Sequence, residues 1–165
     1  MIAVECYPDV EFVISCGVPD RIIRHNGLQM GGSDGKGTVI NYIRGCKCGI
    51  GIIDRDNPKR RPPRDLKNYR EDCVSGDLCL LKRNDNPEKQ IIMIKDGLEK
   101  WLYRRADANH IAPGSFDLPN NPIELHGHDH YEINTEFKFK EFLAALVAVD
   151  SEIKQLKTWL EPFAR

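Results

Sequence analysis

Short apolar runs alternate with amphipathic segments along the first 55 residues of the chain. Residues 1–7, 21–24 and 49–54 contain apolar runs that predict strands, and the continuous run of the third is typical of a central strand covered on both faces. Residues 9–16 and 38–44 carry apolar side chains at helical spacing and predict helices. This order of strand, helix, strand, helix and strand predicts a parallel sheet with helical crossovers.

The rest of the chain predicts two further strands and three helices. One strand is expected at residues 78–81, inside a polar, proline-bearing stretch (57–86), and another at 90–95. A helix follows at residues 98–106. Residues 137–160 show apolar stripes at helical spacing with a break in the middle, and they predict two helices that complete the core.

Together these elements predict a Rossmann-like α/β fold, with an open, mostly parallel sheet flanked by helices and a C-terminal helical pair. A chain of 165 residues is long enough to bury a core of its own and is expected to form a single domain. The core of that domain is expected at residues 1–106, and the helical extension at residues 136–161.

Charge is balanced over the whole chain but uneven along it. Lysine and arginine total 24 and aspartate and glutamate 25, so the net charge of −1 gives no global basic field for nucleic acid. A basic stretch nevertheless follows the third predicted strand. Its members are Lys59, Arg60, Arg61, Arg64, Lys67 and Arg70. Such a stretch can grip a phosphate backbone, although a solvated surface loop is the ordinary role of a charge run.

No apolar run approaches the roughly 18 residues that a membrane-spanning helix needs. The chain enters a strand at its first residues, which leaves no room for a signal peptide. We therefore expect a cytoplasmic protein without membrane contact. The six cysteines are then expected to be reduced thiols, because that compartment disfavours disulfides.

Three acidic residues stand out from this pattern of strands. Glu5 lies in the first apolar run, and Asp54 and Asp56 end the third. Side chains two apart leave a strand on the same side, so the two aspartates repel each other unless a cation neutralises them. In an open parallel sheet, the first and third strands flank the crevice where strand order reverses. The three acids are therefore expected to converge on one or two Mg²⁺ ions, for which oxygen ligands are suited.

A structural role accounts for the same acids without chemistry. Glu5 would then pair with a basic residue, and the two aspartates would cap the loop that follows them. An acid inside an apolar strand argues against this role, because burying an unpaired carboxylate is costly. The residues alone do not decide between the two interpretations.

The acids and their neighbours resemble the topoisomerase–primase (TOPRIM) domain, which has a Glu closing its first strand and an Asp-x-Asp closing its third. The residues that carry the resemblance are Ile2-Ala-Val-Glu5, the helix start Pro8-Asp9, Gly27, and Gly51-Ile-Ile-Asp-Arg-Asp56. The chain looks like a divergent branch, related to small single-domain TOPRIM-like proteins and to the nuclease domains of the OLD (overcoming lysogenisation defect) group. Many relatives carry Gly directly after the Glu, where this chain has Cys6.

The resemblance implies a Mg²⁺- or Mn²⁺-dependent nuclease that cleaves phosphodiester bonds of DNA or RNA. Glu5 would act as general acid/base or metal ligand, and Asp54 and Asp56 as metal ligands. Glu99, in a more weakly similar segment, is either an additional acid of the site or a surface partner of nearby arginines. OLD-group domains are joined to an ATPase, so an ATPase partner is one alternative. A non-catalytic nucleic-acid-binding module is the other.

Two further groups of residues are candidates for binding. Lys36 lies near the start of the second predicted helix, where backbone N–H groups attract phosphate. The nucleic-acid-binding residues are therefore expected to be Lys36, Lys59, Arg60, Arg61 and Arg64. His126, His128 and His130 alternate as in some metal sites, but no second ligand cluster accompanies them, and an exposed loop is the favoured interpretation.

Overall fold

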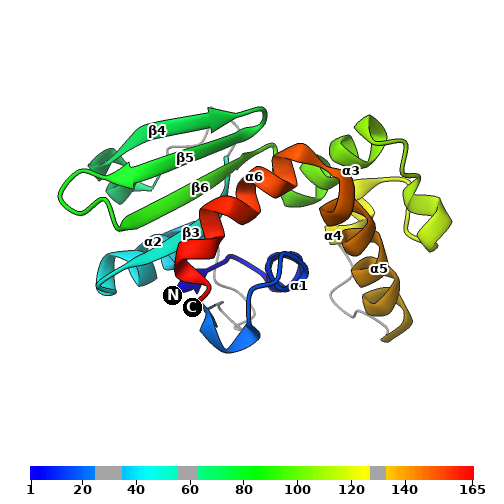
Figure 1. Ribbon diagram of the computed structural model, residues 1–165, viewed down its shortest axis with the longest axis horizontal. Coiled ribbons are helices and arrows are strands. Elements are labelled where there is room, and N and C mark those ends of the chain that lie inside the picture. The colour runs from blue at the N-terminus through cyan, green and yellow to red at the C-terminus, as the bar shows by residue number, and fades with distance from the viewer. Residues whose placement is uncertain (25–34, 56–62, 127–132) are drawn as a thin grey trace.

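The computed structural model describes residues 1–24, 35–55, 63–126 and 133–165. In this part of the chain a six-stranded sheet carries helices on both faces (Figure 1). The order of the strands is β2-β1-β3-β6-β5-β4. The expected α/β class, with an open, mostly parallel sheet and C-terminal helices, is confirmed.

Most elements lie where the pattern predicts them, but the first strand ends before Glu5, and the strand at residues 69–75 and the helix at residues 122–126 were not predicted. The strands are β1 (Ile2–Ala3), β2 (Ile23–Arg24), β3 (Gly49–Arg55), β4 (Tyr69–Ser75), β5 (Leu78–Arg83) and β6 (Lys89–Lys95). The helices are α1 (Tyr7–Ser15), α2 (Gly35–Gly45), α3 (Leu98–Ala108), α4 (Pro122–His126), α5 (Ile133–Val149) and α6 (Ser151–Leu160). Short 3₁₀ turns cover Asp20–Ile22, Arg64–Asn68, Pro113–Phe116 and Glu161–Phe163.

The sheet changes character at β6. Strands β2, β1, β3 and β6 pair in parallel, whereas β5 and β4 add an antiparallel hairpin at one edge. β1 pairs with β2 on one side and with β3 on the other, so the strand order reverses between β1 and β3. In open α/β sheets this reversal opens a crevice at the carboxyl ends of the strands.

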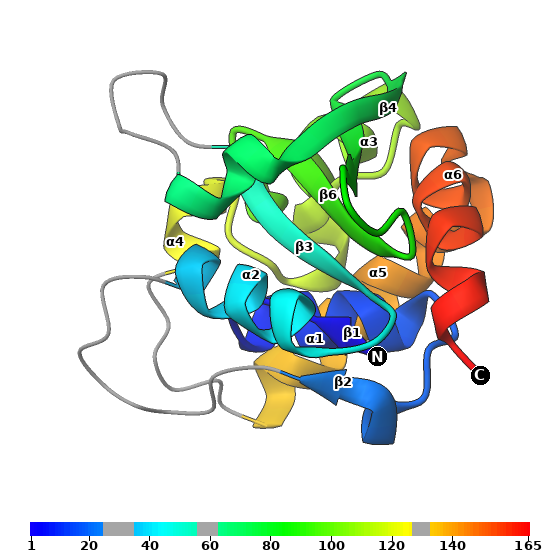
Figure 2. The ribbon, with the colours of Figure 1, turned by 90° about the vertical axis from the view of Figure 1, so that its left-hand side faces the viewer.

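Alternation of side chains along the strands divides the core into two layers. In β3, Ile50 and Ile52 face a large cluster formed with α1, α3, α5 and α6, while Ile53 faces a smaller cluster formed with α2. Figure 2 shows α2 and α6 on different sides of the sheet. Both faces of β3 are thus covered, which explains its uninterrupted apolar sequence.

One strand of the sheet has no apolar signature. Five consecutive residues of β4, Arg70 to Val74, are exposed, and its pairing with β5 is irregular between Glu71 and Cys73. Backbone hydrogen bonds to β5 hold this edge strand in place. The prediction of a single short strand in this region was therefore incomplete, because an exposed edge strand buries too little side-chain surface to mark itself in sequence.

The C-terminal helices break where the sequence predicts. Asp150 lies between α5 and α6, is fully buried, and accepts a hydrogen bond from the Ile153 backbone N–H at 2.9 Å. This is the N-cap contact that starts α6. Apolar residues of both helices then join the larger core cluster.

Two other expectations can be compared with the structure. All six cysteines lie among the described residues, and each carries a free thiol. Over the same residues, no helix combines the length and the apolar character needed to cross a membrane.

Candidate functional site

Glu5 and Asp54 meet at the carboxyl edge of the parallel sheet. Glu5 follows β1, and Asp54 is the next-to-last residue of the adjacent strand β3. The Asp54 backbone N–H donates a hydrogen bond of 2.8 Å to Glu5 Oε1, although the two residues are 49 positions apart in sequence. The structure therefore brings these two predicted residues together at the point where strand order reverses.

Asp54 also reaches the next connection of the sheet. Its Oδ1 accepts a hydrogen bond of 3.1 Å from the backbone N–H of Leu98, the first residue of α3. Asp54 thus caps the start of a helix that follows the neighbouring strand β6. The starts of α1 and α3, each directly after a parallel strand, lie at this same edge, and helix starts favour negative charge.

Asp9 is an additional acid of this region that sequence reasoning did not assign to the site. Its Oδ2 accepts hydrogen bonds from the backbone N–H groups of Glu5 (3.1 Å) and Cys6 (2.9 Å), and from the Cys6 thiol (3.2 Å). The side chain is almost completely buried. Asp9 therefore fixes the turn that presents Glu5. The sequence does contain a pattern that could have identified Asp9: an acid in the first turn of the predicted helix, three residues after the N-cap residue Cys6.

The local electrostatics resist ionisation of these acids. Burial, and then the charges of Asp54 and Asp9, raise the pKa of Glu5 to about 8, although the Asp54 N–H and Lys36 act in the other direction. Burial, with the charges of Asp54 and Glu99, raises the pKa of Asp9 to about 7. Near neutral pH Glu5 and Asp9 therefore tend to hold protons.

Glu99 contributes to the same field. It lies in the first turn of α3, and its residue is only 8% exposed. Its charge raises the pKa values of both Asp9 and Cys6, which places it near the acids that follow β1. Of the two roles predicted for Glu99, the buried position favours an acid beside the site over a surface pair.

Glycines bring the backbone close to the remaining carboxylate oxygens. A Cβ placed on Gly35, at the start of α2, would lie 2.9 Å from Glu5 Oε2, closer than real contacts allow. A Cβ on Gly97 would lie 3.2 Å from Asp54 Oδ2, and Gly97 has a φ of +95° that favours glycine. Close approach of the chain to both carboxylates thus depends on these two residues.

The donor set fits a hard divalent cation in type. Glu5 and Asp54 offer carboxylate oxygens, and the charge of a bound cation would offset the repulsion that raises the pKa of Glu5. Within residues 1–24, 35–55, 63–126 and 133–165, no three Asp, Glu, His or Cys side chains are arranged to hold a metal by themselves. Asp56, the third predicted ligand, lies outside the described residues. Of the three predicted ligands, the structure describes Glu5 and Asp54, and these two lie close enough in the fold to be candidates for binding one cation.

The predicted phosphate-binding residues divide into two groups. Lys36 lies in the first turn of α2 and acts electrostatically on Glu5, so it borders the acids. Arg64 is exposed at the start of the 3₁₀ turn that precedes β4. Lys59, Arg60 and Arg61 lie outside the described residues. The same holds for His128 and His130 of the histidine segment, while the backbone of His126 ends α4.

No model of a known protein family, no curated protein and no solved structure matches this chain. The resemblance to the TOPRIM domain therefore stays an interpretation of the motif residues.

Proposed function

We propose that this protein is a Mg²⁺- or Mn²⁺-dependent nuclease that cleaves phosphodiester bonds of DNA or RNA. Glu5, Asp54 and Asp56 would hold the cation. The observation that carries the proposal is the 2.8 Å contact between Glu5 and the Asp54 backbone at the reversal of strand order. This is the position at which open α/β sheets bind their ligands.

The electrostatics of the acids support a cation over a purely structural role. A carboxyl group with a pKa of about 8 is mostly neutral at pH 7, so it carries a negative charge there only when a nearby positive charge stabilises its ionised form. When bound, a divalent cation supplies polarisation of the phosphodiester and lowers the pKa of a bound water. The charge of the bound cation would lower the pKa of Glu5 again, so Glu5 would be ionised in the loaded site and would act there as a ligand.

Positive groups around the acids support a phosphate-bearing substrate. Lys36, in the first turn of α2, borders Glu5 and offers a positive charge at this edge. Arg64 and the preceding basic residues Lys59, Arg60 and Arg61 follow the strand that carries Asp54. Contacts of this kind hold a nucleic-acid backbone in register without reading its sequence.

The test combines metal binding with cleavage. Mn²⁺ affinity is measured by electron paramagnetic resonance, and cleavage of single- and double-stranded DNA and RNA is followed with and without EDTA. We expect Glu5→Gln and Asp54→Asn to abolish cleavage and to weaken Mn²⁺ binding while thermal unfolding stays cooperative. Glu88→Gln, at an exposed glutamate remote from β1 in sequence, is the matched control and is expected to behave as wild type.

Three outcomes separate the proposals. Loss of cleavage in both site variants supports the nuclease. The non-catalytic binding module is identified by a different result: no cleavage is seen, and the affinity for nucleic acid does not change with EDTA. That affinity falls in a double Arg60→Ala, Arg61→Ala variant. Cleavage that appears only when an ATPase is added identifies the subunit of a larger complex. Cleavage unchanged in Glu5→Gln and Asp54→Asn would overturn the roles assigned to these acids.

A further inference from the structure

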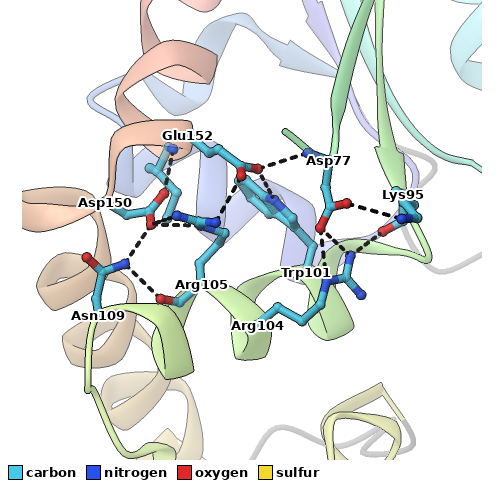
Figure 3. A network of polar contacts seen from close by, with 9 residues as sticks. Asp77, Lys95, Trp101, Arg104, Arg105, Asn109, Asp150 and Glu152 are labelled. Carbon is cyan, nitrogen blue, oxygen red and sulfur yellow. Dashed lines mark hydrogen bonds and ion pairs between the residues drawn. The ribbon is translucent and has the colours of Figure 1, made fainter. Parts of the chain in front are cut away.

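A cluster of polar contacts joins α3 to the β4–β5 hairpin and to α6 (Figure 3). Arg104, two turns into α3, is central to one part of it. Its guanidinium donates to Asp77 Oδ2 from Nε at 3.0 Å and to the backbone carbonyl of Lys95 at 3.0 Å. A longer contact of 3.4 Å reaches Asp96 Oδ2. One side chain thus joins the hairpin, the end of β6 and the turn that follows.

The turn between β6 and α3 has an unusual backbone. Asp96 has a φ of +63° and Gly97 a φ of +95°, so two consecutive residues adopt the left-handed region. For Asp96 this conformation carries strain, since a residue with a Cβ rarely adopts it. Such a turn needs support from surrounding contacts to stay in one conformation. Arg104 supplies this support at Lys95 and Asp96, the two residues that lead into Gly97.

The same turn delivers the hydrogen bond that orients Asp54. Leu98 comes directly after Gly97, and its N–H donates to Asp54 Oδ1 at 3.1 Å. Gly97 itself approaches the other oxygen of that carboxylate. The direction of the Asp54 carboxylate therefore depends on the conformation of this turn, which Arg104 stabilises through its contacts with Lys95 and Asp96.

A second set of contacts anchors the hairpin to which Arg104 binds. Glu152 at the start of α6 accepts hydrogen bonds from the Asp77 backbone N–H at 3.2 Å and from Trp101 Nε1 at 3.0 Å. Arg105 donates to the other oxygen of Glu152 at 2.9 Å. Asp77 is thus held in place by the C-terminal helices, which gives Arg104 a fixed partner.

We infer that Arg104 is a positioning residue, which sets the orientation of the Asp54 carboxylate toward a bound cation through the β6–α3 turn. This inference rests on the proposed function, because it assumes that Asp54 is a metal ligand. Residues that orient a metal ligand from outside the coordination sphere typically contribute about 10- to 100-fold to metal affinity.

Charge alone predicts the opposite effect. Removing a positive side chain near a cation site lowers the repulsion and should tighten Mn²⁺ binding. Loss of orientation should weaken it. Because the two effects differ in sign, the direction of the change distinguishes a positioning role from a general electrostatic one. Arg104→Lys keeps the charge but not the planar group that reaches several acceptors at once.

The test measures Mn²⁺ affinity of the full chain by electron paramagnetic resonance at pH 8, with thermal unfolding in EDTA alongside. We expect Arg104→Ala to weaken Mn²⁺ binding by about 10-fold and Arg104→Lys to weaken it less. The control is Arg83→Ala, which removes a guanidinium that contacts Asp65 and Asp85 and does not touch the β6–α3 turn. This control is expected to bind Mn²⁺ as wild type does.

Each outcome bears on one of the two claims. Unchanged or tighter Mn²⁺ binding by Arg104→Ala, with Asp54→Asn still impaired, would overturn the positioning role and leave the metal site intact. Equal weakening in Arg104→Ala and Arg83→Ala would also overturn it, since general destabilisation would then explain both. Equal binding by wild type and Asp54→Asn would overturn the proposed metal site and, with it, the positioning role.

Discussion

Replacing Glu5 by Gln in the metal-free protein should change how stability depends on pH. The amide keeps an oxygen that can accept the Asp54 N–H, so the hydrogen bond at Oε1 is retained. The substitution removes only the ability to ionise. A comparison of the two proteins therefore isolates the cost of a charge at this position.

The size of the effect follows from the pKa of Glu5, which is about 8 in the folded chain and 4.5 for an ordinary glutamate. The difference, 8 − 4.5, is about 3.5, and a pKa difference of one corresponds to about 1.4 kcal/mol, so the total is about 5 kcal/mol. Because the folded pKa is the higher one, the stabilising contribution is fully present below pH 4.5. It is lost as pH rises through 8, with about 3.5 kcal/mol lost between pH 5 and pH 8.

The assay is urea unfolding in EDTA at pH 5 to 8.5, followed by circular dichroism. Wild type should lose free energy of unfolding as pH rises, and Glu5→Gln should lose clearly less. Part of the slope should remain in the variant, because the pKa of Asp9 is also raised, to about 7. Glu88→Gln should keep the wild-type slope. A wild-type stability that is constant or increases over this range, or a variant with the same slope, would refute the reasoning.

Two further predictions follow from the same contacts. Binding of Mg²⁺ or Mn²⁺ at pH 7 should release close to one proton, because Glu5 is largely protonated without metal. Calorimetry in buffers of different ionisation enthalpy measures the number of protons released. A value of zero would exclude Glu5 as a ligand. Asp150→Ala should lower the free energy of unfolding by about 2–3 kcal/mol, because it removes the N-cap of α6 and the buried acceptor of Arg105 and Asn109, while Arg105 keeps Glu152. A loss below about 1 kcal/mol in urea unfolding would show that the Asp150 contacts are not stabilising.

The pattern of hydrophobic residues was sufficient for the parallel part of the fold. β3 and β6 are apolar on both sides because helices cover both faces of the sheet, and α3 and α6 carry clear apolar stripes. β4 could not be predicted in this way. Its residues are exposed, and what holds it is backbone pairing with β5, which leaves no trace in side-chain composition.

The candidate site divides along a similar line. Glu5 and Asp54 could be paired from sequence, because the apolar runs that contain them predict adjacent strands of a parallel sheet, with both acids at its carboxyl edge. Asp9 is an acid at an ordinary helix start, and its burial arises from packing that sequence does not reveal. Arg104 has no sequence signal at all, since its importance depends on a hairpin and a turn that reach it from elsewhere in the chain.

The backbone hydrogen bonds alone do not require acids at these positions. Glu5 and Asp54 each accept a backbone N–H, a role that the amide oxygen of Gln or Asn fills without charge. If Glu5 and Asp54 served only to accept these hydrogen bonds, the protein would be more stable above neutral pH with amides at both positions, because burying a neutral side chain does not incur the cost of burying a charge. At Glu5 an acid gains from nearby positive charge, which Lys36 supplies in part and a bound cation would increase. The response of Glu5→Gln to Mn²⁺ therefore separates a binding site from a scaffold: the variant should be the more stable protein in EDTA at pH 8, and the order should reverse as Mn²⁺ is added.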